Sequence, residues 1–396
     1  MWYNGQVNLA SREAAGLSRV GLNAHLLSLT ETYRGAGING YILHLLRELP
    51  SVTARFRFVA FLYDRRFLPL AGSPLEVRRS CWPTTNPWSR ILWEQTGLAW
   101  ASHRERLDLL HGLAYATPLA APCPTVVTVH DLSFVRYPQT LRAPNRLYLR
   151  AMTRLAVRKA ARVIAVSAYT RDELTRTWAV PREKVAVVPN GLDRAFHPTD
   201  AASVAEFRRR RGLPERFILS VGTLEPRKNQ ARLVQAYAAA RRRDVKLVLV
   251  GGKGWCYQEV FAQVERWGLS RDVLFPGFVP MEELPWWYRA AEIFVYPSLY
   301  EGFGLPVLEA MASGTPVVAS TASSLPEVAG DAALLIDPYD VEAMTQAMVR
   351  LLDDGALRAE LAARGLRRAA TYSWARTAAE TAAVYRDVLS AREARS

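Results

Sequence analysis

The sequence contains little cysteine and no long apolar run, and each shortage excludes a class of protein. Cys81, Cys123 and Cys256 are odd in number and lack metal-ligand spacing, so we expect a reducing compartment rather than a disulfide framework. No apolar stretch reaches the roughly 18 residues of a membrane-spanning helix. The N-terminus lacks a basic start followed by an apolar run, so we expect no signal peptide and a cytoplasmic protein. The sequence leaves open a peripheral attachment to the inner face of the plasma membrane.

Lysine is also scarce, although the chain is basic. Lys plus Arg number 51 against 37 Asp plus Glu, which gives a formal net charge of +14. Arginine supplies most of this charge, because lysine is confined to Lys159, Lys184, Lys228, Lys246 and Lys253. A basic balance fits phosphate-bearing substrates, an anionic membrane surface or nucleic acid, although an arginine-rich genome produces it too. No nucleic-acid-binding module is recognisable, so we expect no nucleic-acid partner.

A chain of 396 residues is too long for one ordinary core, which predicts two domains. Strand-like apolar runs alternate with helical periodicity in both halves, a pattern typical of parallel sheets covered on both faces. We therefore expect an α/β fold with two doubly wound, Rossmann-like domains that face a central ligand-binding cleft. The first domain is predicted over residues 1–196 and the second over 212–372, with an arginine-rich boundary at 192–213.

The element pattern is clearest for the buried strands. In the first half, strands are expected at 19–22, 56–62, 163–166 and 185–188, with short apolar runs at 107–111 and 125–130. Residues 35–40 read as a glycine-rich loop before a helix at 41–49, and a basic helix is expected at 144–161. In the second half, strands are expected at 217–221, 246–250, 273–275, 293–296, 316–319 and 333–336. A last helix is expected from Ser373-Trp374 to about Ser390.

Two carboxylates, Glu301 and Glu309, flank a glycine-rich turn in the most informative segment of the chain. Gly302 and Gly304 allow a sharp turn and a close approach to a ligand. A helix is expected from about Pro306, because proline is favoured at the first helical position.

The start of this helix predicts a binding site for a phosphate. The N–H groups of Phe303, Gly304 and Leu305 would point outward at the positive end of the helix dipole. A carboxylate beside a phosphate site needs another ligand, and sugar hydroxyls are the natural candidates. The segment therefore indicates a site for a sugar joined to a phosphate.

Two cations follow the strand at 217–221. Arg227 and Lys228 come after Pro226 at a strand-to-helix junction, where positive charge opposes the helix dipole. The ordinary alternative is a solvated surface pair. The loop position, the proline and a lysine in an arginine-rich chain favour binding of a diphosphate.

His130 is the candidate site residue of the first half. It ends the strand-like run 125–130 and is followed by Asp131, which favours a position in the cleft over a structural role. The loop 35–40, which includes Gly37, would bring backbone N–H groups to the same ligand. The glycines at 251–254 are weak evidence alone, because most glycine clusters are turns.

The sequence lacks the motifs of several other enzyme classes. The sequence has no H-E-x-x-H, G-x-S-x-G or C-x-x-C motif, and no acidic cluster suited to Mg²⁺. We therefore expect no metal site and no cofactor, with the phosphate charge neutralised by Arg227, Lys228 and a helix terminus.

Together these motifs resemble the retaining glycosyltransferases of family 4, which have the GT-B fold. The Glu-to-Glu spacing with its Gly-Phe-Gly interior and the segment Glu-Pro-Arg-Lys-Asn at 225–229 carry the resemblance. They look like the bacterial mannosyltransferase branch that builds surface polysaccharides. Thr223 departs from the family, because many members carry arginine there, and this leaves open which arginine binds phosphate.

The resemblance implies a role for each residue of the second domain. Glu309 would hold the ribose hydroxyls, and Glu301 would contact the hexose near its anomeric carbon. Arg227 and Lys228 would bind the diphosphate as it leaves. The backbone near Val279 would meet the base.

The resemblance also implies roles for the first domain. Gly37 would contact phosphate, and His130 would position the donor sugar and help orient the acceptor. The last helix, within 373–396, would pack back onto this domain and complete it.

The activity implied is transfer of a hexose, with mannose from GDP-mannose as the best match, to a glycan or lipid-linked acceptor. UDP-hexoses come next as donors. An epimerase, a phosphorylase and a non-catalytic sugar-nucleotide-binding subunit are the alternatives. The Trp-rich stretch 82–100 and the basic helix at 146–162 would contact a lipid-linked acceptor or an anionic membrane, or else are core aromatics and a solvated helix face.

Overall fold

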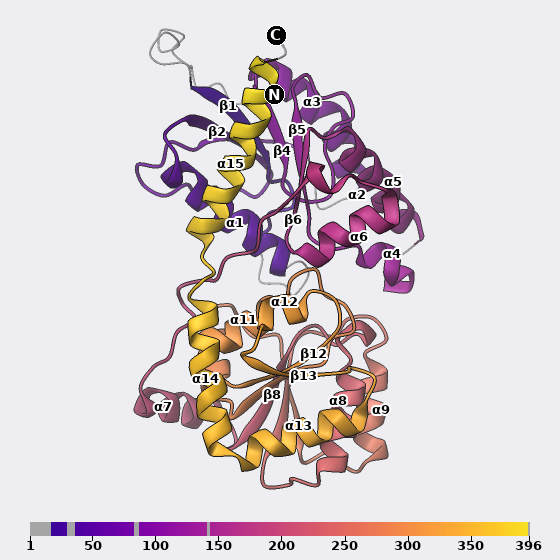
Figure 1. The fold of residues 1–396 in the computed structure, drawn as a ribbon, viewed down its shortest axis with the longest axis vertical. Helices are drawn as coiled ribbons and strands as arrows, with labels where there is room; N and C mark the ends of the chain where they lie inside the picture. Colours follow the sequence, from indigo (N-terminus) through magenta and orange to yellow (C-terminus); the bar gives the residue numbers. More distant parts are fainter. Residues whose placement is uncertain (1–16, 30–35, 83–86, 141–142, 395–396) are drawn as a thin grey trace. The chain divides into compact units, whose positions relative to one another are not determined.

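The computed structural model describes residues 17–29, 36–82, 87–140 and 143–394 (Figure 1). Gly35, the N-terminal stretch 1–16 and residues 83–86 of the Trp-rich segment lie outside the described residues. The chain divides into two compact units, the first containing the described residues up to Gly191 and those from Trp374 onward. The second unit runs from Leu192 to Ser373.

A single parallel sheet forms the centre of the first unit. Its strands are β1 (Ser18–Asn23), β2 (Phe56–Leu62), β3 (Glu76–Arg79), β4 (Leu109–Gly112), β5 (Thr125–Val129), β6 (Arg162–Ala165) and β7 (Val185–Val187). They lie in the order β3-β2-β1-β4-β5-β6-β7. The expected strands are confirmed, but β3 was missed because its sequence Glu-Val-Arg-Arg is charged and half-exposed at the sheet edge.

Helices cover both faces of this sheet. They are α1 (Ala36–Val52), α2 (Pro87–Leu92), the π-helix η2 (Trp93–Gly97), α3 (Leu98–Arg104), α4 (Ser133–Arg136), α5 (Ala143–Lys159), α6 (Ala168–Trp178) and α15 (Trp374–Glu393), with 3₁₀ turns at Pro138–Thr140 and Arg182–Lys184. Helices α1 and α15 lie on one side of the sheet, and α5 and α6 on the other (Figure 1). Alternate residues of β6 show this division, since Ile164 faces the α1–α15 core and Val163 faces the α5–α6 core.

The expected loop at 35–40 is wrong over its described part. Helix α1 begins at Ala36, so Gly37 and Gly40 lie in its first turns. Glycine weakens a helix, but Tyr41, Ile42 and Leu45 bury one face of α1 completely. Burial of this face outweighs the poor helix propensity of the two glycines.

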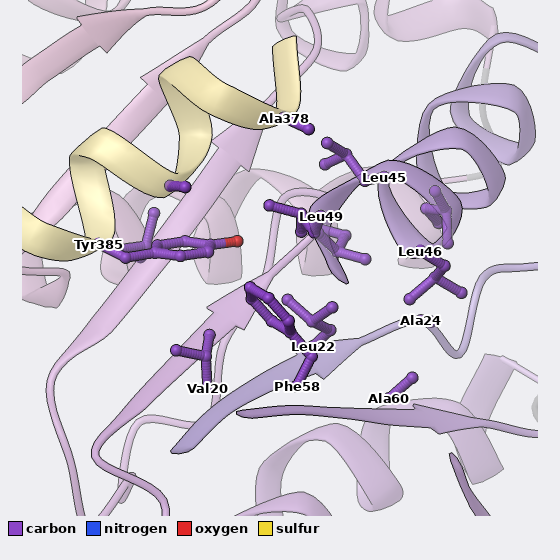
Figure 2. Packing of buried hydrophobic residues seen from close by; sticks show 14 of the residues in the cluster. Val20, Leu22, Ala24, Leu45, Leu46, Leu49, Phe58, Ala60, Ala378 and Tyr385 are labelled. Carbon is purple, nitrogen blue, oxygen red and sulfur yellow. The ribbon is translucent and has the colours of Figure 1, made fainter. Parts of the chain in front are cut away.

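The C-terminal helix is part of the core of the first unit. Tyr385 and Ala378 of α15 pack among Leu49 of α1 and Phe58 of β2 (Figure 2). The buried Tyr385 hydroxyl lies 2.6 Å from His111 Nδ1 of β4. Helix α15 therefore completes the covering of the first sheet, although it follows the whole second unit in the chain.

The second unit repeats the order of the first six strands of the first unit on a separate sheet. Its strands are β8 (Phe217–Val221), β9 (Lys246–Val250), β10 (Val273–Gly277), β11 (Ile293–Tyr296), β12 (Val317–Ser320) and β13 (Ala333–Ile336), in the order β10-β9-β8-β11-β12-β13. Its helices are α7 (Ala201–Arg211), α8 (Gln230–Ala240), α9 (Gln258–Arg266), α10 (Leu284–Ala290), α11 (Leu305–Ala312), α12 (Leu325–Ala329), α13 (Val341–Asp353) and α14 (Gly355–Ala369), with a 3₁₀ turn at Pro226–Lys228. All six expected strands are present.

Helix α7 lies within the arginine-rich segment 192–213, where the domain boundary was expected. Asp200 caps this helix by accepting a hydrogen bond from the N–H of Ser203, and Gly212 ends it in a left-handed conformation. Only Val204 and Phe207 are buried, and arginine fills the last turn, so the sequence shows little periodicity. Among the described residues, no helix is long and apolar enough to cross a membrane.

Candidate functional site

The carboxyl edge of the second sheet brings two loops together. Strands β8 and β11 are neighbours, and the strand order reverses between them, which is where open α/β sheets bind ligands. Arg227 and Lys228 follow β8, and Glu301 follows β11. The two cations are neighbours in the chain and lie more than 70 residues before Glu301, but the sheet places their side chains in contact with its carboxylate.

Glu301 lies at the centre of this cluster. Lys228 Nζ donates a 2.6 Å hydrogen bond to Glu301 Oε1, and Arg227 Nη1 lies 3.2 Å from Oε2. Arg227 also pairs with Glu225 at 2.7 Å. The Lys228 and Arg227 side chains are only 12% and 16% exposed, so the alternative of a solvated surface pair is wrong.

The charges in this cluster determine the protonation of Glu301. Burial alone would raise the pKa of Glu301, but Lys228 and Arg227 lower it to about 2. Burial, together with the nearby Arg227, lowers the pKa of Lys228 against the opposing attraction of Glu301. The two cations and the carboxylates of Glu225 and Glu301 are therefore mutually neutralised.

Hydroxyl groups that the sequence analysis missed hold Glu301 in place. The hydroxyls of Tyr296 and Ser298 donate to Glu301 Oε1 over 2.8 and 2.6 Å. Lys228 also donates to the Tyr296 hydroxyl over 2.7 Å. Tyr296 ends β11, and Ser298 follows two residues later. Both lie within five residues of Glu301 in the sequence, and this closeness was the one signal that could have identified them.

The turn before α11 is fixed by two serines from the loop after β12. Ser324 Oγ lies 2.6 Å from the Phe303 carbonyl and 3.0 Å from the Glu301 carbonyl. The N–H of Glu301 donates to Ser323 Oγ over 2.8 Å. These contacts fix the backbone of residues 301–303, and nothing in the local sequence of Ser323 and Ser324 indicated them.

Gly304 provides the backbone conformation that starts α11. Its φ of +122° is rare for any residue with a side chain, and a Cβ would lie 2.7 Å from Leu325 Cδ2. The helix begins at Leu305, with Pro306 in its first turn as expected. Gly302, Phe303, Gly304 and Leu305 therefore form one turn at a helix N-terminus, directly after Glu301.

Glu309 lies on α11 in a different environment from Glu301. Its Oε2 accepts a 2.9 Å hydrogen bond from the Tyr288 hydroxyl of α10. Burial raises the pKa of Glu309 to about 7, with a further contribution from Asp193 and an opposing one from the Tyr288 hydrogen bond. The pKa values of the two glutamates are thus shifted in opposite directions.

The glycine-rich loop after β9 has a packing role. A Cβ on Gly251 would lie 2.0 Å from the Gly222 carbonyl oxygen, so only glycine lets the loops after β8 and β9 meet. The N–H of Gly251 also donates to the Gly277 carbonyl over 2.8 Å. Val279, the predicted base contact, follows two residues after Gly277 and is buried.

His130 lies at the corresponding edge of the first sheet, directly after β5. Its Nε2 lies 2.9 Å from the Leu113 carbonyl, so Nε2 carries the proton and Nδ1 is an acceptor. Burial lowers the pKa of His130 and keeps the ring neutral. The ring packs edge-on against Tyr41, which lies one turn after Gly37 in α1.

Comparison with known proteins identifies the family. The family model for glycosyltransferase family 4 matches residues 35–196, and the model for glycosyl transferases group 1 matches residues 204–368. The chain is 34% identical over 292 residues to O-antigen chain mannosyltransferase B of Escherichia coli, covering 73% of this chain and 76% of that protein. The chain is a family 4 glycosyltransferase.

Another relative is longer than this glycosyltransferase. The chain is 32% identical over 283 residues to the serotype-specific mannosyltransferase WbdA of Escherichia coli, covering 68% of this chain and 34% of WbdA. The chain therefore spans about one third of the length of that relative. Both relatives bear out the predicted resemblance to bacterial mannosyltransferases.

Solved structures confirm the GT-B fold of this glycosyltransferase. Sucrose-phosphate synthase from Thermosynechococcus elongatus superposes with a TM-score of 0.75 at 24% identity, covering 94% of this chain and all of that one. Anabaena HepE, in complex with UDP and glucose, gives a TM-score of 0.73 at 20% identity, covering 93% of this chain and 100% of its own. The glycosyltransferase thus has two doubly wound domains, as the sequence predicted.

Proposed function

We propose that this glycosyltransferase transfers mannose from GDP-mannose to a hydroxyl of a glycan or lipid-linked acceptor, with retention of anomeric configuration. The mannosyltransferase relatives support the sugar, and their O-antigen and serotype roles support a product in surface polysaccharide synthesis. The proposed location is the cytoplasm, including the inner face of the plasma membrane. Nucleic acid has no part in this function.

The contact of Lys228 and Arg227 with Glu301 carries the proposal. Glu301 would accept hydrogen bonds from hydroxyls of the hexose near its anomeric carbon, because its pKa of about 2 keeps it ionised. Lys228 has three N–H groups, and Glu301 and Tyr296 accept two of them. The third would bind the diphosphate, together with Arg227 and the first turn of α11.

The remaining predicted contacts divide by ligand group. Glu309 would accept hydrogen bonds from the ribose hydroxyls, and the backbone at Val279 would meet the base. Gly37 would approach phosphate. His130 would offer its unprotonated Nδ1 to a sugar hydroxyl, which fits a neutral ring whose Nε2 donates elsewhere.

Catalysis would depend on positioning and on electrostatic stabilisation of the leaving diphosphate. Lys228 and Arg227 would balance the charge that develops as the glycosidic bond breaks. The departing phosphate would accept the proton of the incoming hydroxyl on the same face of the sugar, which retains the configuration. No cofactor and no metal enter this scheme.

A UDP-hexose is the second candidate donor. Its support is the likeness in fold to HepE, whose structure contains UDP and glucose. A non-catalytic sugar-nucleotide-binding subunit would keep the same contacts and transfer nothing.

Two measurements test the proposal. Thermal shift with GDP-mannose, UDP-glucose and the free nucleotides should show the largest stabilisation with GDP-mannose, because a ligand bound only by the folded state raises the melting temperature. NMR of the product formed on a mannose-containing acceptor should then show the α configuration of the donor. A larger shift with UDP-glucose would favour the second donor, and a product of inverted configuration would exclude the retaining scheme.

A further inference from the structure

Helix α5 exposes leucines on its outer side. Leu147 is 69% exposed and Leu155 is 44% exposed, although leucine is normally buried. With Ala151 they recur every fourth residue, so they lie along one side of the helix. Arg150, Arg154 and Arg158 lie at helical spacing beside them. We call these six residues the α5 strip.

Burial of the opposite side fixes α5 without help from the strip. Thr153, Ala156 and Val157 are fully buried, and the two apolar residues pack in the core with residues of β5 and β6. The helix lies on the outside of the first sheet (Figure 1). The exposed leucines are therefore not needed to hold α5 on the sheet.

The charge of the strip is not compensated within the protein. Helix α5 contains no acidic residue. Within the ranges that the structure describes, Arg150, Arg154 and Arg158 form no ion pair, whereas Arg78 pairs with Glu105 and Arg216 with Glu292. Three unneutralised arginines between exposed leucines indicate an anionic partner with an apolar interior.

Further exposed apolar side chains lie on the neighbouring segments. Leu92 of α2 is 51% exposed and Trp100 of α3 is 52% exposed. The π-helix η2 between them is joined to α5 by a 3.0 Å hydrogen bond from the Tyr148 hydroxyl to Glu94. The exposed apolar residues of the first unit are therefore not confined to α5.

We propose that the α5 strip docks on an anionic lipid surface. Leucines would enter the boundary between headgroups and acyl chains, and arginines would bind lipid phosphates, as basic amphipathic helices do. A second copy of the chain is a poorer occupant, because two such strips repel each other. The inference rests on the part of the proposed function that places the enzyme at the membrane.

Flotation of the full chain with vesicles tests the proposal. The protein should float with phosphatidylcholine vesicles containing 30% phosphatidylglycerol at low salt, and should remain unbound with phosphatidylcholine alone. High salt should weaken binding, because salt screens the attraction to lipid phosphates. Absence of binding to the anionic vesicles at low salt would overturn the proposal.

Vesicle binding is compared between a variant that loses the arginines of α5 and a control that loses three arginines of α7. The variant Arg150→Gln/Arg154→Gln/Arg158→Gln should lose about fivefold in partition coefficient per arginine, or about a hundredfold in all. The control Arg209→Gln/Arg210→Gln/Arg211→Gln removes the same charge from the exposed end of α7 and should lose less than fivefold. Equal losses would mean that net charge rather than the strip binds lipid.

The apolar contribution has its own variant. Leu147→Gln/Leu155→Gln leaves all charges in place and should reduce partitioning at least tenfold, because burial of leucine supplies part of the binding. Unchanged binding by this variant would overturn docking through the strip, and so would sedimentation showing that the leucines mediate a dimer. Thermal shift with GDP-mannose in the absence of lipid separates the two proposals, because the strip variants should bind the donor like the wild type.

Discussion

The hydroxyl of Tyr288 donates a 2.9 Å hydrogen bond to a carboxylate oxygen of Glu309, in a site where both side chains are buried. Burial outweighs this hydrogen bond and leaves the pKa of Glu309 at about 7. The protonation of the proposed ribose contact therefore changes within the physiological range.

Donor affinity should rise with pH. The ionised form of Glu309 is the better acceptor for ribose hydroxyls, so GDP-mannose should bind about tenfold more weakly at pH 6 than at pH 8, by linkage. The donor is suited to this test because its diphosphate is esterified at both ends and does not titrate here. Calorimetry of the wild type and Glu309→Gln checks it, and the variant should show no such dependence.

The same carboxyl should affect stability in the absence of ligand. A folded pKa above the unfolded value of 4.5 means that the folded state binds the proton more tightly, so stability is lost as pH rises from about 4.5 to about 7. The full effect corresponds to about 3 kcal/mol. Denaturant unfolding of the wild type and Glu309→Gln at pH 5 and pH 8 should show the difference between the two proteins changing by up to this amount. A pH-independent difference would contradict the raised pKa.

Lys228→Met should reduce kcat by about 10²–10³, because it removes a donor from the leaving diphosphate. Removing one partner of a buried ion pair should also destabilise the fold, by up to about 3–5 kcal/mol. The matched control is Lys246→Met, which breaks the Lys246–Asp272 pair of 2.6 Å at the start of β9 and should keep its kcat.

The double variant Lys228→Met/Glu301→Gln separates stability from catalysis. It removes one positive and one negative charge, so it should recover part of the lost stability while remaining inactive. Turnover by Lys228→Met within about tenfold of the wild type would argue against the phosphate assignment.

Gly304→Ala should destabilise the second domain by about 1–3 kcal/mol, because alanine is strained at a φ of +122°. Gly40→Ala in α1 is the control, since a Cβ there meets nothing within 4 Å and alanine is the better helix former. Chemical denaturation should show that Gly304→Ala lowers the free energy of unfolding and that Gly40→Ala raises it. Equal stability of the two would mean that Gly304 is not required by its conformation.

Treatment with EDTA, followed by dialysis, should leave transfer unchanged if Lys228, Arg227 and the start of α11 alone balance the diphosphate. Activity measured before treatment, after treatment and after addition of Mg²⁺ or Mn²⁺ checks this. If activity is lost on treatment and returns only with a divalent ion, a metal takes part in transfer and the proposed scheme is incomplete.

Most strands were predictable because a strand that is buried on both faces has a mostly apolar sequence. Segments such as 217–221 and 246–250 are mostly apolar, with four apolar residues in five, and their bounds in the structure are those expected. The same rule failed for β3, where an edge strand keeps its charged residues half-exposed. It also failed at the start of α1, where glycines read as a loop although Tyr41 and Leu45 are buried.

The sequence by itself determined the family and the two parallel sheets, and it singled out Glu301, Lys228 and Arg227 as candidate site residues, because local spacing and residue type carry that information. Only the tertiary structure decided that Lys228 and Arg227 neutralise Glu301, that Tyr288 holds Glu309, and that Ser323 and Ser324 fix the turn between the two glutamates. These contacts join residues that are far apart in the chain. They depend on the order in which parallel strands lie side by side, and each pKa depends on the burial that this packing produces.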